Sequence, residues 1–181
     1  VAVTSGCNQA FCASISSFTS ENDEVIIPTP WYFNHHMWLQ MAGVKSIPLD
    51  TDANMNPIIE KAEALITDRT RAIVLVSPNN PSGAIYSNQL LQKFFDLCKS
   101  NQIRLIIDET YKDFHPNASQ PHTLLENNNW DQVLTILYSF SKTYRMTGHR
   151  IGALLTSKEN LIEIEKALDT FTVCPPQLGQ Y

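Results

Sequence analysis

The sequence predicts an α/β protein: a three-layer sandwich in which helices cover both faces of a mostly parallel central sheet. Two apolar runs, RAIVLVS at 71–77 and QIRLII at 102–107, are nearly continuous, as is typical of parallel strands buried on both faces. Strand patterns alternate with helix patterns along the chain. Polar residues follow the carboxyl ends of the predicted strands, where ligands bind in open sheets of this kind.

Each element is predicted from its hydrophobic period and its flanking residues. The segment PTPWYFNHHMW at 28–38 is expected to continue past a strand end, because two prolines restrict its backbone. The polar stretch at 117–129 is expected to be a loop. Residues 1–5 are a short apolar start, and apolar runs predict strands at 24–28, 46–50, 71–77, 102–107, 131–138 and 151–155. Helical spacing of apolar residues predicts helices at 8–20, 57–67, 88–101 and 158–172.

Length and composition indicate an ordinary globular domain. A chain of 181 residues can bury one core, so we expect a single domain over 1–181. Hydrophobic residues make up 43% and charged residues 17% of the sequence. The net charge of −5, with no basic stripe, argues against a nucleic-acid partner. The chain opens on VAVTSG without an initiator Met, and we expect it to be a piece of a longer protein.

The cysteines and the hydropathy pattern address cellular location. Four cysteines lie scattered without CxxC spacing, which argues against a zinc site and against a disulfide framework. Reduced thiols fit a cytoplasmic protein. No apolar stretch approaches the ~20 residues that a membrane span needs, and no signal peptide is present. We therefore expect no membrane partner and no metal.

The segment SFSKTYRMTGHRIG at 139–152 is the most informative part of the chain. Lys142 lies just past a buried strand, where an amine can lose its proton more easily than in water and can form a Schiff base. Arg150 follows eight positions on, and its guanidinium group suits a phosphate or a carboxylate. By itself, such a lysine is also compatible with a solvated surface charge.

Other polar positions allow both a structural and a functional interpretation. Asp108 follows the apolar run LII, where it is either a helix cap or ion-pair member, or a carboxylate that awaits a positive partner. The turn TSGCNQA at 4–10 is either a plain helix start or a phosphate site. The aromatic rings after 30 pack in the core or stack on a flat ligand. His35 and His36 are adjacent, which is not metal-ligand spacing, and we expect them at the surface or lining a site.

Six motifs in order resemble the class I/II aminotransferases, which are fold-type-I enzymes that use pyridoxal 5′-phosphate. The resemblance covers nearly the whole chain and is to the large, cofactor-binding domain of that family. It implies an aminotransferase-like large domain, with the N-terminal arm and the C-terminal small domain absent. The motifs are TSGCNQA, PTPWY, SPNNPSG, DETY, SFSK and GHRIG.

The resemblance implies a role for each residue that contacts the cofactor ring. Lys142 is the residue that forms the Schiff base and moves the proton between the substrate α carbon and the cofactor. Asp108 pairs with the pyridine nitrogen. Tyr111 and Asn80 donate hydrogen bonds to the 3′ oxygen of the ring. Tyr32, rather than its neighbour Trp31, stacks on the ring.

The resemblance also implies which residues hold the phosphate. These are Gly6, Cys7, Asn8, Ser139 and Arg150, with Ser141 as a weaker candidate. Cys7 departs from the small or hydroxylic residue that is usual in that loop, so a backbone contact survives but a hydroxyl contact does not. Ser82 replaces the commoner threonine of the NNPTG pattern, which is a mild change.

The function implied is transfer of an amino group between an amino acid and a 2-oxo acid, by a protein that is a homodimer at full length. The family binds the substrate carboxylate through an arginine of the small domain, so this piece alone could be inactive. Alternatives are another pyridoxal-phosphate reaction at the α carbon (a lyase or decarboxylase), a ligand-sensing domain of a transcription regulator, or a degenerate domain. We also hypothesise that Trp31, Phe33 and His35 line the site entrance.

Overall fold

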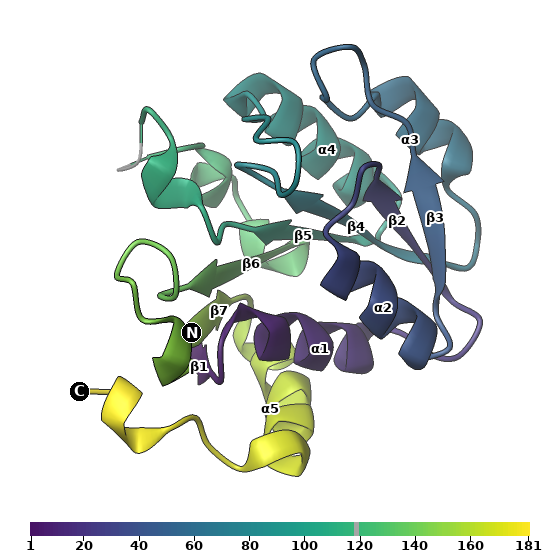
Figure 1. Ribbon diagram of the computed structural model, residues 1–181. Helices are drawn as coiled ribbons and strands as arrows, with labels where there is room; N and C mark the ends of the chain where they lie inside the picture. The colour runs from purple at the N-terminus through teal and green to yellow at the C-terminus, as the bar shows by residue number, and fades with distance from the viewer. Residues whose placement is uncertain (118–119) are drawn as a thin grey trace.

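The computed structural model describes residues 1–117 and 120–181, and a single sheet of seven strands forms its centre (Figure 1). The strand order across the sheet is β1-β7-β6-β5-β4-β2-β3. The strands are β1 (Ala2–Thr4), β2 (Glu24–Pro28), β3 (Lys45–Leu49), β4 (Thr70–Val76), β5 (Arg104–Asp108), β6 (Leu134–Ser139) and β7 (Gly152–Leu155).

Of the strands that the structure describes, only β7 runs against the others. It pairs antiparallel with β6 on one side and with β1 on the other, while the β2–β3, β2–β4, β4–β5 and β5–β6 pairs are parallel. The register places Asp108 opposite Val76 on one side and Leu137 on the other. The carboxyl ends of six strands and the amino end of β7 therefore lie along one edge of the sheet.

Helices cover both faces of the sheet, which gives three layers (Figure 1). The two helices α3 and α4 pack on one face, and the three helices α1, α2 and α5 pack on the other. Their bounds are α1 (Cys7–Phe18), α2 (Phe33–Met41), α3 (Ile59–Leu65), α4 (Asn88–Ser100) and α5 (Lys158–Thr172).

The apolar residues of the central strands alternate between the two cores. On β4, Ile73 and Leu75 face α3 and α4, whereas Ala72 and Val74 face α1 and α2. Because both faces of the sheet are covered by helices, the side chains of β4 are buried on either face, and its sequence is a continuous apolar run. Burying each large side chain stabilises the fold by about 1.5–3 kcal/mol. The largest buried helical side chains are Phe11 and Ile15 of α1, Leu39 of α2, and Leu91, Phe94 and Phe95 of α4.

The predicted fold class is confirmed, and most elements lie within a few residues of their predicted bounds. The sequence patterns assigned no helix to the segment after β2, where the structure has α2 beginning at Phe33. This helix carries apolar or aromatic residues on most of its faces, so its sequence shows no amphipathic period. The helix is stabilised by burial against α1, although its sequence has no amphipathic pattern.

The stretch predicted as a loop at 117–129 contains a single 3-10 turn, Leu124–Glu126, and the prediction for 118–119 lies outside the described residues. Within the described part of the chain, no helix has the length and apolar character needed to cross a bilayer.

Gly152 permits the close approach of α1 to the sheet. A Cβ atom at this position would lie 2.6 Å from the Cys7 backbone nitrogen, 2.6 Å from the Gly6 carbonyl carbon and 2.9 Å from the Tyr138 carbonyl oxygen. Backbone atoms cannot move aside as a flexible side chain can, so we predict that Gly152→Ala lowers the free energy of unfolding by about 1–3 kcal/mol.

Urea unfolding followed by circular dichroism measures this change. Gly148→Ala is the matched control, since a Cβ atom there would have no neighbour within 4 Å among the described residues. Equal stability of the two variants would show that the start of α1 moves away without cost.

Candidate active site

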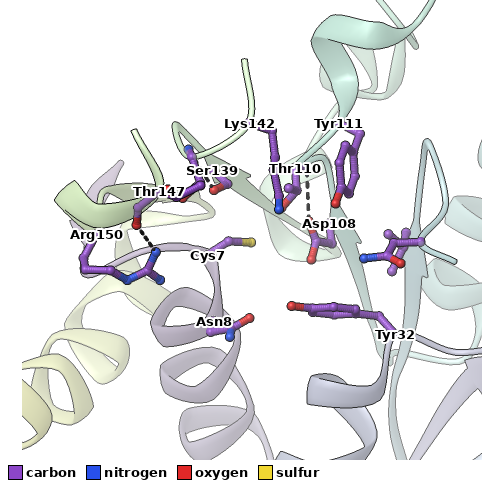
Figure 2. Close-up of a pocket in the computed structure, with 13 residues that line it drawn as sticks. Cys7, Asn8, Tyr32, Asp108, Thr110, Tyr111, Ser139, Lys142, Thr147 and Arg150 are labelled. Carbon is purple, nitrogen blue, oxygen red and sulfur yellow. Dashed lines mark hydrogen bonds between the residues drawn. The ribbon is translucent and has the colours of Figure 1, made fainter. Parts of the chain in front are cut away.

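A cavity of about 260 Å³ lies at the edge of the sheet where the strands end (Figure 2). Nine of the ten site residues predicted from the sequence line it, and so does Ser141. The tenth, Gly6, lies against the guanidinium group of Arg150. The lining residues are Cys7, Asn8, Tyr32, Val76, Asn80, Asp108, Thr110, Tyr111, Ser139, Ser141, Lys142, Thr147 and Arg150.

The topology explains why residues far apart in the sequence meet here. Asp108 and Ser139 are the last residues of β5 and β6, which are adjacent strands. Parallel neighbours end at the same edge, so their terminal side chains lie close together. Arg150 comes two residues before β7 rather than after it, and the antiparallel direction of β7 brings it to the same edge.

Asp108 is buried, with 3% of its surface exposed, and its carboxylate has two partners. Oδ1 accepts a hydrogen bond of 2.9 Å from the backbone N–H of Thr110. Oδ2 lies 3.2 Å from His35 Nε2, although this contact does not reach the geometry of a full hydrogen bond. Burial alone would raise the pKa of Asp108, but His35 and Thr110 outweigh it and hold this pKa below its usual value. Asp108 is therefore a carboxylate at neutral pH.

His35 is held under Asp108 by aromatic packing. Its ring stacks on Phe11 of α1 with centroids 3.9 Å apart, and it meets the Tyr32 ring edge-on at 5.1 Å. Only 2% of His35 is exposed, so the expectation of a surface or entrance position for this residue was wrong. Trp31 and Phe33 are not among the residues that line the cavity itself, and Phe33 lies exposed beside Tyr32.

The opposite end of the cavity is formed by the first turn of α1. The helix starts at Cys7, so its first backbone N–H groups have no partner within the helix and carry partial positive charge. The Arg150 guanidinium group lies against Gly6, where a Cβ atom would collide with Nη2, and Nη1 donates to the Thr147 carbonyl at 2.9 Å. Burial raises the pKa of Cys7, which keeps its thiol uncharged. This end attracts an anion.

Lys142 and Tyr111 lie between these two ends, and Figure 2 shows their polar atoms pointing toward Asp108. Lys142 Nζ is 5.8 Å from the centroid of the Tyr111 ring. Across residues 1–117 and 120–181, the side chains of Lys142, Tyr111 and Asn80 make no hydrogen bond within the chain. An amine, a phenol and an amide therefore face the cavity with their polar groups available.

This set of groups fits pyridoxal 5′-phosphate. A carboxylate at one end suits a protonated ring nitrogen, and a helix N-terminus with an arginine at the other end suits a phosphate. The Tyr32 ring borders the cavity and offers a flat apolar face, and its hydroxyl accepts a hydrogen bond of 2.9 Å from Asn34. The cavity has room for one substituted pyridine ring.

Three lining residues and one supporting residue were not predicted from the sequence. Thr147 contributes through its backbone carbonyl, which any residue type supplies, whereas Thr110 acts on Asp108 through both its side chain and its backbone N–H, and only their place inside DETY and the lysine segment could have indicated them. Val76 is the last residue of β4 and follows the strand pattern. The role of His35 depends on how α2 packs against α1, which no local pattern shows.

The contact with His35 generates a pH-dependent prediction. The folded-state pKa of Asp108 lies below the unfolded value of about 3.9, so its contribution to stability is present above that pH and is lost as the pH falls through the folded pKa. In His35→Asn the contact that lowers the pKa of Asp108 is lost, so burial becomes the dominant effect on this pKa and raises it. Stability at pH 7 then falls by about 1–3 kcal/mol, and the deficit shrinks as the pH is lowered toward 4.

Urea unfolding at several pH values tests this expectation. In an Asp108→Asn background, where no carboxylate is present, His35→Asn should cost less and its effect should lose the pH dependence attributed to Asp108. A deficit that is the same at every pH in both backgrounds would mean that His35 acts only by packing against Phe11.

Comparison with known proteins agrees with this geometry. The family model described as aminotransferase class I and II matches residues 1–181. The chain is 29% identical to an aspartate aminotransferase of Thermotoga maritima over 183 aligned residues, covering 100% of this chain and 48% of that protein. It is 31% identical to an aromatic aminotransferase of Arabidopsis thaliana, covering 99% of this chain and 46% of that protein.

Solved structures show the same fold. An aromatic aminotransferase from Pyrococcus horikoshii superposes with a TM-score of 0.91 at 28% identity, over 99% of this chain and 48% of that one. An Escherichia coli protein with a methionine aminotransferase function gives a TM-score of 0.89 at 26% identity, over 98% and 47%. The chain spans about half the length of the relatives it matches. It belongs to the class I and II aminotransferase family.

Proposed function

We propose that the protein carrying this chain is a pyridoxal-phosphate-dependent aminotransferase that moves an amino group between an amino acid and a 2-oxo acid. The observation that supports this most is the convergence of Lys142, Asp108 and Tyr111 on one cavity whose far end is a helix N-terminus with Arg150. When bound, the cofactor supplies an aldehyde that forms a Schiff base with an amine, and a protonated ring that stabilises negative charge on the neighbouring carbon.

In this proposal the ring-binding residues set the charge state of the ligand. Asp108 holds the proton on the ring nitrogen, and its lowered pKa keeps it a carboxylate that can do so. Tyr111 and Asn80 donate hydrogen bonds to the oxygen on the ring. Tyr32 covers one face of the ring and excludes water from it.

The phosphate-binding residues hold the ligand in place. The backbone N–H groups of Cys7 and Asn8, the Ser139 hydroxyl and the Arg150 guanidinium group would surround the phosphate. Gly6, whose own N–H donates to the Thr4 carbonyl, would leave Arg150 the room to approach. Lys142 Nζ, at the centre of the cavity, holds a proton and moves it to and from the substrate α carbon. Fixed contacts to the phosphate would keep the reacting atoms close to the Lys142 side-chain nitrogen.

We propose that residues 1–181 form one large domain, and that an N-terminal arm and a small domain complete it in the whole protein. This proposal is supported by the coverage of the relatives, because the chain matches only about half of the length of each. We also propose a cytoplasmic location, which the four free cysteines support. In this proposal the residues that line the cavity bind the cofactor, so residues outside this cavity determine which substrate side chain is accepted.

Replacing Lys142 tests the proposed chemistry directly. Incubation with pyridoxal phosphate followed by borohydride should fix the cofactor on the peptide that contains Lys142, as measured by mass spectrometry. Lys142→Ala should lose this product and should lower the rate of amino transfer by roughly 10²–10⁴-fold. Lys158→Ala is the matched control, since Lys158 is exposed at the start of α5.

An amino acid donor then distinguishes transamination from the alternatives. Conversion of the bound cofactor to pyridoxamine phosphate, with release of a 2-oxo acid, supports the proposed reaction. Release of ammonia or carbon dioxide instead would favour a lyase or a decarboxylase. Equal labelling of several lysines in the whole protein would rule out the assignment of Lys142.

We further propose that the whole protein is a homodimer. Three exposed aromatic residues flank the cavity: Phe33 beside Tyr32, Phe114 beside Tyr111, and Tyr144 in the segment after Lys142. Their exposed fractions are 61%, 63% and 56%, which supports a covering surface at the mouth of the site. Sedimentation should give twice the mass of one chain. A monomeric mass together with full activity would exclude this proposal.

A further inference from the structure

Asp113 lies outside the cavity and accepts hydrogen bonds from three side chains. Oδ2 accepts from the Tyr138 hydroxyl at 2.5 Å and from Thr143 Oγ1 at 3.0 Å. Oδ1 accepts from Lys112 Nζ at 3.0 Å. None of these four residues lines the cavity, so the cofactor-binding roles described above leave their arrangement unexplained.

These bonds join the segments that carry the reactive groups. Asp113 follows Tyr111 by two residues, and Thr143 is the residue directly after Lys142. Tyr138 belongs to β6 and comes directly before Ser139. One carboxylate therefore links the segment after β5, the end of β6 and the loop that contains Lys142.

The loop at 140–149 depends on this link. Its other hydrogen bonds are internal or run to its own ends at Ser139, Arg150 and Ile151. Between residues 142–149 and any described segment outside 139–151, Thr143 to Asp113 is the single hydrogen bond. Thr143 itself is exposed, so this hydrogen bond rather than burial holds its side chain, while Tyr144 packs on Phe140 within the loop.

The charge on Asp113 strengthens the link. Burial tends to raise its pKa, but the bonds from Tyr138, Lys112 and Thr143 outweigh burial and hold the pKa below its usual value. Burial and the neighbouring carboxylate raise the pKa of Tyr138, so the phenol keeps the proton that it donates. Hydrogen bonds to an ionised acceptor are about twice as strong as neutral ones.

We propose that Asp113 is a positioning residue that holds the Lys142 loop against the Tyr111 segment and so fixes where Lys142 Nζ stands relative to the Tyr111 ring, 5.8 Å away. The inference rests on the proposed function for its catalytic consequence. The restraint on the loop is a property of the chain alone and is measurable without the cofactor.

Two substitutions at Thr143 separate the hydrogen bond from the shape of the side chain. Thr143→Val keeps the shape and removes the hydroxyl, whereas Thr143→Ser keeps the hydroxyl. We expect amide hydrogen exchange in residues 142–149 to become roughly tenfold faster in Thr143→Val, and to remain close to wild type in Thr143→Ser. Exchange in α4, far from the loop, should be unchanged in both.

The kinetic readout distinguishes positioning from simple stabilisation. In the holoenzyme, Thr143→Val should lower kcat by roughly tenfold or more while KM changes less, because misplacement of the amine affects the reacting geometry. Thr143→Ser should restore most of kcat. Thr170→Val, the same substitution on the exposed end of α5, controls for the general effect of removing a hydroxyl.

Asp113→Asn provides an independent test at the other end of the bond. It keeps an acceptor oxygen but removes the charge, so its effects on exchange and kcat should lie between those of Thr143→Ser and Thr143→Val. Equal exchange and equal kcat in Thr143→Val and Thr143→Ser would overturn the positioning role. Failure of the proposed function would look different, since wild-type protein would then show neither labelling of Lys142 nor amino transfer, while the exchange result would still stand.

Discussion

The buried charge of Asp108 is the constraint on which the rest of the site depends. An ionised carboxylate at the end of an apolar strand is costly unless it has partners, and here the partners come from outside the strand. Thr110 supplies a backbone N–H from the next turn, and His35 supplies a ring nitrogen from α2. Phe11 of α1 fixes the plane of that ring. Two helices on one face of the sheet thus prepare a negative charge at its edge.

Much of the fold and of the candidate site could be predicted from the sequence, because both are encoded locally. The apolar run at 71–77 forms the covered strand β4, and the motifs around Asp108 and Lys142 follow strand ends directly. Parallel strands end at one edge, so knowing that a residue follows a strand is almost enough to place it. For this reason nine of ten predicted residues line one cavity.

The remainder depends on contacts between distant segments, which local patterns do not contain. The sequence of α2 has no amphipathic period, so neither the helix nor the burial of His35 could be predicted. The bond between Asp113 and Thr143 joins residues 30 positions apart, and each residue alone resembles an ordinary polar surface position. The close packing at Gly152 likewise becomes visible only when α1 lies beside β7.

The reversed direction of β7 has a consequence for how the protein folds and holds its ligand. It brings Arg150, just before β7, against Gly6, just after β1, so the anion-binding end of the cavity exists only after β1 and β7 have paired. A partly folded chain in which β1 or β7 is unpaired would have no complete anion-binding end. A ligand that binds only the complete sheet stabilises it against global unfolding, by an amount set by concentration and affinity, and leaves smaller local openings elsewhere unaffected. Retention of an anionic ligand in this cavity would then indicate that β1 and β7 are paired in the sheet.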